Sequence, residues 1–417
     1  MSEQHTIIVG GGVIGVCCAY ELARRGSRVT LVERDRIGGA ASFGNAGSIA
    51  PGHAPINRPG VVWQAMRWML RPTSPIYIAP RADPALARWL WRFRSHCTER
   101  HRDYCMGVLG PLGHLSQALF DRMIDEERLS CDYRNEGYYE IYRTENGFTG
   151  GRAEALRQVP LGYDPRVLSG DEVREREPAL APHVRGAVWH TEGATCNPHT
   201  FVRELAARAE QRGAEIRTGV AVERVEVSRG RASGVVTAAS ETIEADTVLL
   251  ATGVYSQQLL RDLGPGLPLQ PAKGYHRDVS TADGESPGLT LSCLLAEDVI
   301  FCSPIDDFVR LAGTLEFSGL NHDLRRSRVD QLTRGAAKYF DRIGTGDTRS
   351  EWCGLRPCLP DGLPAVGWVP GVEGVFVANG HAMMGLTLGP ITGRLVAESI
   401  LDRRPSFEIG AMRPDRF

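Results

Sequence analysis

Residues 5–35 read HTIIVGGGVIGVCCAYELARRGSRVTLVERD, and this stretch decides the fold. A strand-like apolar run leads through glycines into an apolar helical run, and a second strand-like run follows. Gly10, Gly12 and Gly15 have the GxGxxG spacing, which allows a tight turn, close backbone approach to a pyrophosphate and close helix–strand packing. Glu33 closes the second strand, where a carboxylate can accept ribose hydroxyls. We predict a Rossmann-like dinucleotide-binding domain; the alternative is a merely glycine-rich turn.

This fingerprint occurs once in the sequence. Other glycine-rich segments, such as GPGLPLQPAKG at residues 264–274, do not lead from a strand into a helix. FAD and NAD both fit the fingerprint itself. Because an enzyme that uses both cofactors normally needs two fingerprints, we expect one bound dinucleotide.

The composition is that of an ordinary globular protein with two lobes. The chain has 417 residues, 24% of them charged, and a formal net charge of −2, so it lacks the basic excess of a nucleic-acid-binding protein. Its ten cysteines form no CxxC pair, which argues against a metal site or a disulfide framework and favours small buried hydrophobic side chains in a reducing compartment.

The apolar runs are short. The longest, at residues 247–254, cannot cross a bilayer, and the first strand already begins at Thr6, so we expect no signal peptide. We expect a cytoplasmic protein, or one held peripherally at the inner face of the cell membrane.

Later segments alternate between nucleotide-domain and strand-rich character. A long loop, expected to be functional, covers residues 36–60; two helices follow, the second capped by Asp83, and a third lies around residues 112–129. Further expected elements are strands at 137–143 and 186–190, a helical segment near Asp171, a helix at 197–213, a hairpin-like meander at 215–239, and a central parallel strand in ADTVLLATG, residues 245–253.

This order predicts an α/β fold with a discontinuous dinucleotide domain. We assign residues 1–133, 192–268 and 352–417 to that domain, and residues 134–191 and 269–351 to an inserted β-rich substrate domain.

A second glycine-rich turn lies near the end of the chain. Residues 380–393 read GHAMMGLTLGPITG and run into the helical pattern RLVAESIL. We expect a loop over residues 380–388 and a helix that starts at Gly389 or Pro390; the alternative is a glycine-rich helix connection with no ligand.

Together these motifs resemble those of the D-amino-acid oxidase superfamily, which are FAD-dependent amine and amino-acid oxidoreductases. The resemblance covers essentially the whole chain, and within the superfamily the SFGNAGSIAPG loop and the RWML and RWLW helices look most like the D-amino-acid dehydrogenases. It implies FAD as the cofactor, in a domain of the glutathione-reductase type. In order, the motifs are GGGVIG (10–15) with Glu33, SFGNAG (42–47), LLATGVYS (249–256), GLRP (354–357) and GHAMMGLTLGPITG.

The resemblance also implies where FAD is held. The first turn would bind the pyrophosphate, Glu33 and Arg34 the adenosine, and the C-terminal turn the flavin, with a helix N-terminus stabilising negative charge on the reduced ring. Where the dehydrogenases often read GHGxxGWT, this chain has Ala382 in place of a glycine, which bears on the backbone geometry of that turn. The implied contacts are Gly10, Gly12, Val13, Ile14, Gly15, Glu33, Arg34, Ala41, Ser42, Asn45, Gly47, Ser48, Val222, Ala251, Gly253, Gly380, His381, Met384, Gly385, Leu386 and Thr387.

Four residues are candidates for the substrate site. Arg356 in GLRP resembles the carboxylate-binding arginine of the superfamily, and a guanidinium suits a carboxylate; its alternative role is to bridge the two domains. Tyr275 could offer its hydroxyl to the same carboxylate or cap the pocket, although an aromatic residue in a strand is as often a core residue. His53 and His381 are candidates for the flavin face, with a purely structural histidine as the alternative.

Tryptophans gather in one arginine-rich region. Trp63, Trp68, Trp89 and Trp91 lie within 29 positions, and at helical spacing Trp91 falls opposite the apolar stripe, beside Arg88 and Arg92. An aromatic side chain between cations on a polar face is typical of a membrane interface or of a site for an electron-accepting partner. The alternative is that Trp91 packs against another part of the chain.

The resemblance therefore implies an FAD-dependent D-amino-acid dehydrogenase. A hydride would pass from the α-carbon to flavin N5, and the electrons would pass to a quinone-like acceptor. Cyclic substrates such as D-proline or hydroxy-D-proline are included in this prediction. The alternatives are a glycine- or sarcosine-type oxidase that uses O2, and a flavoprotein subunit without catalytic activity.

Overall fold

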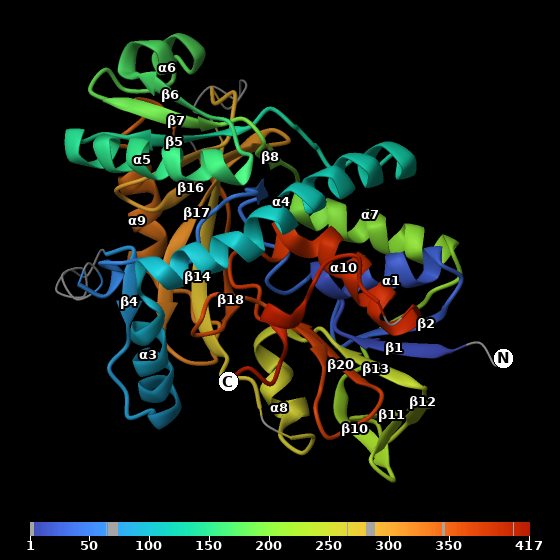
Figure 1. The fold of residues 1–417 in the computed structure, drawn as a ribbon. Coiled ribbons are helices and arrows are strands. Elements are labelled where there is room, and N and C mark those ends of the chain that lie inside the picture. Colours follow the sequence, from blue (N-terminus) through green and yellow to red (C-terminus); the bar gives the residue numbers. More distant parts are fainter. Residues whose placement is uncertain are drawn as a thin grey trace.

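The computed structural model describes residues 4–63, 65, 74–264, 266–280, 288–343, 347–402 and 404–417 (Figure 1). The first helix expected after the long loop, which contains RWML and Trp68, lies largely outside these residues. None of the described helices is long and apolar enough to traverse a lipid bilayer.

A six-stranded sheet forms the nucleotide-domain core, and it confirms the Rossmann-like prediction. Its order is β19-β20-β13-β1-β2-β9, parallel except for β19. The ADTVLLATG segment supplies β13 between β1 and β20, as predicted for a central parallel strand. The strands are β1 (His5–Val9), β2 (Arg28–Glu33), β9 (Glu215–Thr218), β13 (Thr247–Leu250), β19 (Ala365–Trp368) and β20 (Val375–Asn379).

Helices cover one face of this sheet and a β-meander covers the other. Apolar side chains of α1, α4, α7 and α10 form one core with the sheet, and β10 and β11 form a second core against its opposite face (Figure 1). The helices are α1 (Val13–Arg24), α4 (Glu99–Glu127), α7 (Pro198–Gln211) and α10 (Gly385–Leu401). The meander is β10 (Val222–Ser228), β11 (Arg231–Thr237) and β12 (Thr242–Glu244).

A nine-stranded mixed sheet forms the second lobe. Its order is β18-β14-β17-β16-β15-β5-β7-β6, with β4 added beside β17. The strands are β4 (Ile76–Ile78), β5 (Tyr138–Tyr142), β6 (Pro165–Ser169), β7 (Gly186–His190), β14 (Gln270–Val279), β15 (Cys293–Leu295), β16 (Ile300–Ile305), β17 (Phe308–Phe317) and β18 (Thr348–Cys358). One face packs against α9 (Arg326–Ala336).

The remaining elements are short or peripheral. They are β3 (Ser48–Ile49) paired with β8 (Ala194–Thr195), the helices α3 (Pro84–His96), α5 (Glu145–Gln158), α6 (Gly170–Arg176) and α8 (Ser256–Leu260), and 3-10 turns at Val159–Leu161, Gly253–Tyr255 and Gly410–Met412. Asp83 caps α3 by accepting a hydrogen bond from the Leu86 amide, as predicted. The predicted domain boundary at residue 352 falls within strand β18, which continues across it. The division of the chain into domains remains a prediction.

Three expected boundaries were wrong. Helix α4 begins at Glu99 rather than near residue 112, because Thr98 caps it and its buried stripe already starts at Arg102 and Cys105. Residues 215–218 pair with β2 in the parallel sheet instead of joining the meander. Helix α10 begins at Gly385 rather than at Gly389 or Pro390, so Pro390 lies within its second turn.

Candidate active site

A single cavity of about 1100 Å³ extends from the first glycine turn to the nine-stranded sheet. It brings together segments that are far apart in the sequence, from the N-terminal turn to the C-terminal one. Nearly every predicted site residue lines it. The exceptions are Gly15, Gly47 and Gly380.

Glycine suits the three fingerprint positions for different structural reasons. Gly10 has a φ of +111°, and a Cβ there would lie 2.6 Å from the Ala251 carbonyl oxygen. A Cβ at Gly15 would overlap the Gly10 carbonyl oxygen, so helix α1 can approach β1 only with glycine at that position. A Cβ at Gly12 would meet only the Ser42 hydroxyl, at 3.6 Å. Protein packing therefore requires Gly10 and Gly15, whereas the absence of a side chain at Gly12 leaves cavity space.

Glu33 is oriented by main-chain amides. Its Oε2 accepts a hydrogen bond from the Gly11 amide at 2.7 Å, and its Oε1 accepts one from the Asp35 amide at 2.9 Å. Each carboxylate oxygen keeps a further lone pair. Beside it, the Arg34 guanidinium lies over the Tyr255 ring, 3.8 Å from the centroid.

The loop after β2 carries polar groups into the cavity. The Ser42 hydroxyl accepts a hydrogen bond from the Val13 amide at the start of α1, at 3.0 Å. Asn45 Oδ1 accepts one from the Gly47 amide at 2.8 Å. The Ser48 hydroxyl is buried, and among the described residues it has no hydrogen-bond partner. A buried polar atom of this kind needs a partner, and a ligand in the cavity would supply one.

The C-terminal turn brings a second helix N-terminus to the same cavity. Met384, Gly385, Leu386 and Thr387, at the start of α10, line the cavity. The Thr387 hydroxyl accepts a hydrogen bond from the Ala50 amide at 3.1 Å, which ties this turn to the N-terminal loop. Within α10, glycine also serves helix packing: a Cβ at Gly393 would lie 2.5 Å from the Cys17 carbonyl oxygen of α1.

Ala382 and His381 are fitted tightly into this turn. Ala382 adopts a φ of +47°, the left-handed region that favours glycine, so the alanine retains a glycine-like backbone at a cost of about 1–2 kcal/mol. His381 is 4% exposed, and its Nε2 lies 3.0 Å from the Thr392 hydroxyl. Burial lowers the pKa of His381 to about 3, so the imidazole is neutral at physiological pH.

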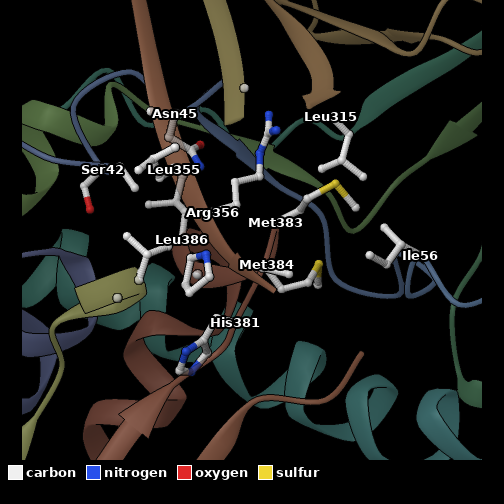
Figure 2. A pocket seen from close by; sticks show the side chains of 18 of the residues that line it. Ser42, Asn45, Ile56, Leu315, Leu355, Arg356, His381, Met383, Met384 and Leu386 are labelled. Atoms are coloured by element: carbon white, nitrogen blue, oxygen red, sulfur yellow. The ribbon is translucent and has the colours of Figure 1, made fainter. Parts of the chain in front are cut away.

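Arg356 lies on the cavity face of the large sheet. Its guanidinium crosses over Gly274, where any side chain would overlap it, and Nη1 donates to the Thr314 carbonyl at 2.8 Å. No acidic side chain in the described part of the chain pairs with it. Burial lowers the pKa of Arg356 from its usual value, although arginine stays charged. Figure 2 shows the side chain directed toward the strands and away from His381.

Tyr275 does not share that face. In the β14–β18 register Ala272 pairs with Arg356, whereas Tyr275 pairs with Cys353, and side chains one position apart along a strand point to opposite faces. Tyr275 is 1% exposed in the core against α9, and its hydroxyl donates to Glu316 at 3.1 Å. Tyr275 still borders the cavity, but Glu316 engages its hydroxyl. Its packing matches the core alternative, and a contact of this hydroxyl with a substrate carboxylate remains a prediction.

His53 lines the cavity at the end of the N-terminal loop. Burial lowers the pKa of its imidazole, and the positive charge of nearby Arg58 acts in the same direction. Glu140 and His190, from β5 and β7, line the same part of the cavity, with Glu140 Oε2 3.4 Å from His190 Nε2. The alternation in YYEIY, which places Glu140 on the same face as two tyrosines, could have indicated this carboxylate.

Thr314 could not have been found from the sequence. It lies at a bulge in β17 and has a φ of +65°, a strained conformation for a β-branched residue. Its carbonyl accepts the hydrogen bond from Arg356, while its hydroxyl is buried without a partner among the described residues.

Comparison with known proteins gives the family. A model of the DAO family, described as FAD dependent oxidoreductase, matches residues 5–399. The chain belongs to this FAD-dependent oxidoreductase family. It is 34% identical over 411 residues to the D-amino acid dehydrogenase of Methylobacterium radiotolerans, covering 96% of this chain and 97% of that protein.

Solved structures of low sequence identity have the same fold. Glycine oxidase from Geobacillus kaustophilus superposes with a TM-score of 0.81 at 23% identity, covering 99% of both chains. L-proline dehydrogenase from P. horikoshii superposes with a TM-score of 0.79 at 17% identity, covering 100% of this chain and 98% of that one. They confirm the architecture of an FAD domain joined to a mixed-sheet domain.

The residues present fit FAD as the cofactor of this family member. The space left at Gly12 suits a pyrophosphate, the anchored Glu33 carboxylate suits ribose hydroxyls, and the unpartnered Ser48 hydroxyl suits a polar group of the ligand. The chain is thus an FAD-dependent oxidoreductase that resembles the D-amino-acid dehydrogenases.

Proposed function

We propose that this protein oxidises free D-amino acids to imino acids and passes the electrons to a quinone-like acceptor. The observation that carries the proposal is Arg356, a half-buried cation that lines the cavity without an acidic partner in the described residues. A buried charge without a counterion is unfavourable, and a carboxylate-bearing substrate would relieve it. The D configuration rests on the relatives, which are D-amino acid dehydrogenases at 31–34% identity.

Positioning is the main task of the chain's own residues. Arg356 would hold the substrate carboxylate, with Thr314 and Gly274 fixing where its guanidinium points. His381 is neutral, so it adds no positive charge that would repel a substrate ammonium group. Bound FAD would supply the two-electron acceptor for the hydride of the α-carbon.

The surface of α3 supports a role in electron delivery. Trp91 is 72% exposed and lines the cavity together with Arg94, so the cavity reaches the surface at this helix. Arg88, Arg92 and Arg94 have no acidic partner among the described residues, and α3 contains no acidic residue. Such a cationic, aromatic face suits an anionic membrane surface that carries a lipid-soluble acceptor.

Anaerobic flavin reduction tests the proposal. The purified, FAD-loaded protein is mixed without oxygen with D- and L-amino acids, glycine, sarcosine, D-proline and hydroxy-D-proline, and the loss of flavin absorbance is followed. We expect reduction by D-amino acids and little or none by their L-enantiomers. If none of the amines reduces the flavin, the enzymatic proposal fails and a non-catalytic flavoprotein subunit becomes the better description.

The fate of the electrons distinguishes a dehydrogenase from an oxidase. The reduced protein is mixed with either air-saturated buffer or a soluble quinone, and reoxidation of the flavin is timed. Faster reoxidation by the quinone supports the dehydrogenase, whereas rapid reoxidation by oxygen with release of hydrogen peroxide favours the amine-oxidase alternative.

A further inference from the structure

The cavity contains a second charged group, Glu140, which the proposed chemistry does not use. Its side chain is 27% exposed, but the exposed part faces the cavity, where Glu140 lies among the lining residues. Burial would raise the pKa of Glu140, but its hydrogen-bond contact to His190 holds this pKa below its usual value. The carboxylate is therefore ionised at neutral pH.

No arginine or lysine of the described residues forms an ion pair with Glu140; its side-chain partner is His190, at 3.4 Å. Burial lowers the pKa of His53, so that imidazole is neutral, and Arg58 nearby is exposed to solvent, which screens its charge. Glu154, another carboxylate at the cavity, differs from Glu140 because it is paired with Arg102. Glu140 thus presents negative charge to the cavity.

Glu140 and Arg356 lie on the same face of the sheet. Glu140 pairs with Leu294, Leu294 with Phe301, and Phe301 with Ala312, so these four side chains form a row across the strands. All four residues line the cavity. Ala312 pairs in turn with His276 of β14, which is on the same face as Ala272 and therefore as Arg356.

The separation of the two charges follows from the sheet register. The guanidinium is bound to the carbonyl of Thr314, two residues from Ala312, and three strand intervals separate β17 from β5. With about 4.8 Å between strands and about 3.3 Å per residue, the two backbone positions are about 16 Å apart. The Glu140 side chain shortens the gap between the charged groups.

An extended basic amino acid matches this gap. From its carboxylate carbon to its terminal nitrogen, lysine spans about 7–8 Å, since each of its six intervening bonds advances about 1.25 Å along the chain. Hydrogen bonds of about 2.8–3.0 Å at each end bring the total to about 13 Å. A shorter or neutral side chain would leave Glu140 without a partner.

Building on the proposed function, we propose that Glu140 selects D-amino acids with a cationic side chain, such as D-lysine and D-arginine, by pairing with the distal charge while Arg356 holds the carboxylate. His190 is then a positioning residue that orients the Glu140 carboxylate. Selectivity of this kind is expected because truncating one partner of a buried charge pair leaves the other charge uncompensated.

The test compares D-lysine with D-norleucine, which has the same carbon chain without the charge. We expect wild-type kcat/KM for anaerobic flavin reduction to favour D-lysine, and Glu140→Gln to lower the D-lysine to D-norleucine ratio by at least about tenfold while D-norleucine is oxidised normally. Glu140→Asp, with one methylene fewer, should shift the preference toward the longer D-arginine. Glu154→Gln is the matched control and should leave the ratio unchanged.

A binding measurement supplements the rates. 6-Aminohexanoate carries the carboxylate and the terminal ammonium of lysine but no α-amine, so it binds without turnover. The ratio of its Kd to that of hexanoate, both measured by thermal shift, reports the pairing of the distal charge. Equal Kd values for 6-aminohexanoate and hexanoate overturn this inference. So does a ratio of these Kd values that Glu140→Gln leaves unchanged in a variant with normal flavin content. Reduction of the flavin by D-norleucine with no preference for D-lysine overturns it alone, whereas reduction by no D-amino acid overturns the proposed function as well.

Discussion

At the level of single residues, Arg356 and Gly274 form one structural pair. The guanidinium can cross β14 only because position 274 has no side chain, and Arg356 lines the cavity. The two residues are 82 positions apart, so their pairing depends on the antiparallel register of β14 and β18.

Replacing Arg356 should therefore remove carboxylate recognition. We expect Arg356→Ala to weaken binding of a D-amino acid by about 2–5 kcal/mol, because a charge-assisted pair is lost. Arg356→Lys keeps the charge without the planar fork and should recover only part of the affinity. The measurement is kcat/KM for flavin reduction, with Arg166→Ala, an exposed arginine, as the control. Unchanged affinity in Arg356→Ala would refute the assignment.

Thr314 has a strained backbone and an unpartnered hydroxyl, and its carbonyl binds Arg356. We therefore expect its hydroxyl to affect substrate binding. Thr314→Val keeps the side-chain shape and removes the hydroxyl. We expect stability to stay constant or to rise by up to about 1–3 kcal/mol, since an unsatisfied buried group is removed, while substrate KM increases. Thr314→Ser keeps the hydroxyl and should retain the wild-type KM. A Val variant with lower stability and normal KM would assign Thr314 a purely structural role.

At the level of elements, helices α1 and α10 act as a pair. Both N-termini border the cavity, and the glycines along α10 let it pack directly on the backbone of α1. Positive partial charge from both helices is thus directed at the cofactor site.

Two glycine substitutions in the first turn should have different outcomes. Gly15→Ala places a Cβ on the Gly10 carbonyl and should lower both the thermal stability of the apoprotein and its flavin content. Gly12→Ala meets only the Ser42 hydroxyl, so the apoprotein should keep its stability and lose FAD affinity. The stability of each variant is measured by melting curves of the apoprotein, and its FAD binding by the flavin content per chain. Equal loss of stability in both variants would show that Gly12, too, is required by packing alone.

Helix α3 should govern association with anionic membranes. We expect the wild-type protein to sediment with vesicles that contain phosphatidylglycerol at low salt, and much less with neutral vesicles, because its arginines are unpaired. Arg88→Glu together with Arg92→Glu should abolish this binding, whereas Arg152→Glu on α5 should not. If wild type fails to bind anionic vesicles at low salt, α3 contacts a protein partner or none.

At the level of the whole molecule, two buried histidines connect folding stability to pH. Burial lowers the pKa of His381 to about 3 and that of His276 to about 4, from an ordinary value of 6.5. Below pH 6.5 the unfolded chain takes up protons that the folded protein does not, so stability is highest above pH 6.5 and decreases as the pH falls toward the folded values.

This decrease should be measurable by urea unfolding between pH 5 and pH 8. Each histidine contributes a slope that approaches about 1.4 kcal/mol per pH unit below pH 6. His381→Gln should reduce the slope relative to wild type, and His183→Gln, at an exposed position, should not. A slope that His381→Gln leaves unchanged would contradict neutral burial of this residue.

The nucleotide-binding half of the protein could be predicted from the sequence because its signals are local. Gly10, Gly12, Gly15 and Glu33 lie within 24 residues of one another, and the turn chemistry that they require is readable from their types and spacing. The ordered motifs further along the chain indicated the family, and with it FAD and the overall architecture.

The substrate side of the cavity was decided by tertiary structure. Whether the side chain of Tyr275 lies on the same sheet face as Arg356 depends on the strand register, and the strain at Thr314 depends on a bulge between strands. Likewise the first turn of α10 is tied to the N-terminal loop, since the Thr387 hydroxyl accepts a hydrogen bond from the Ala50 amide, 337 positions away. Such features arise from pairing between distant segments, which residue type and spacing along the chain do not encode.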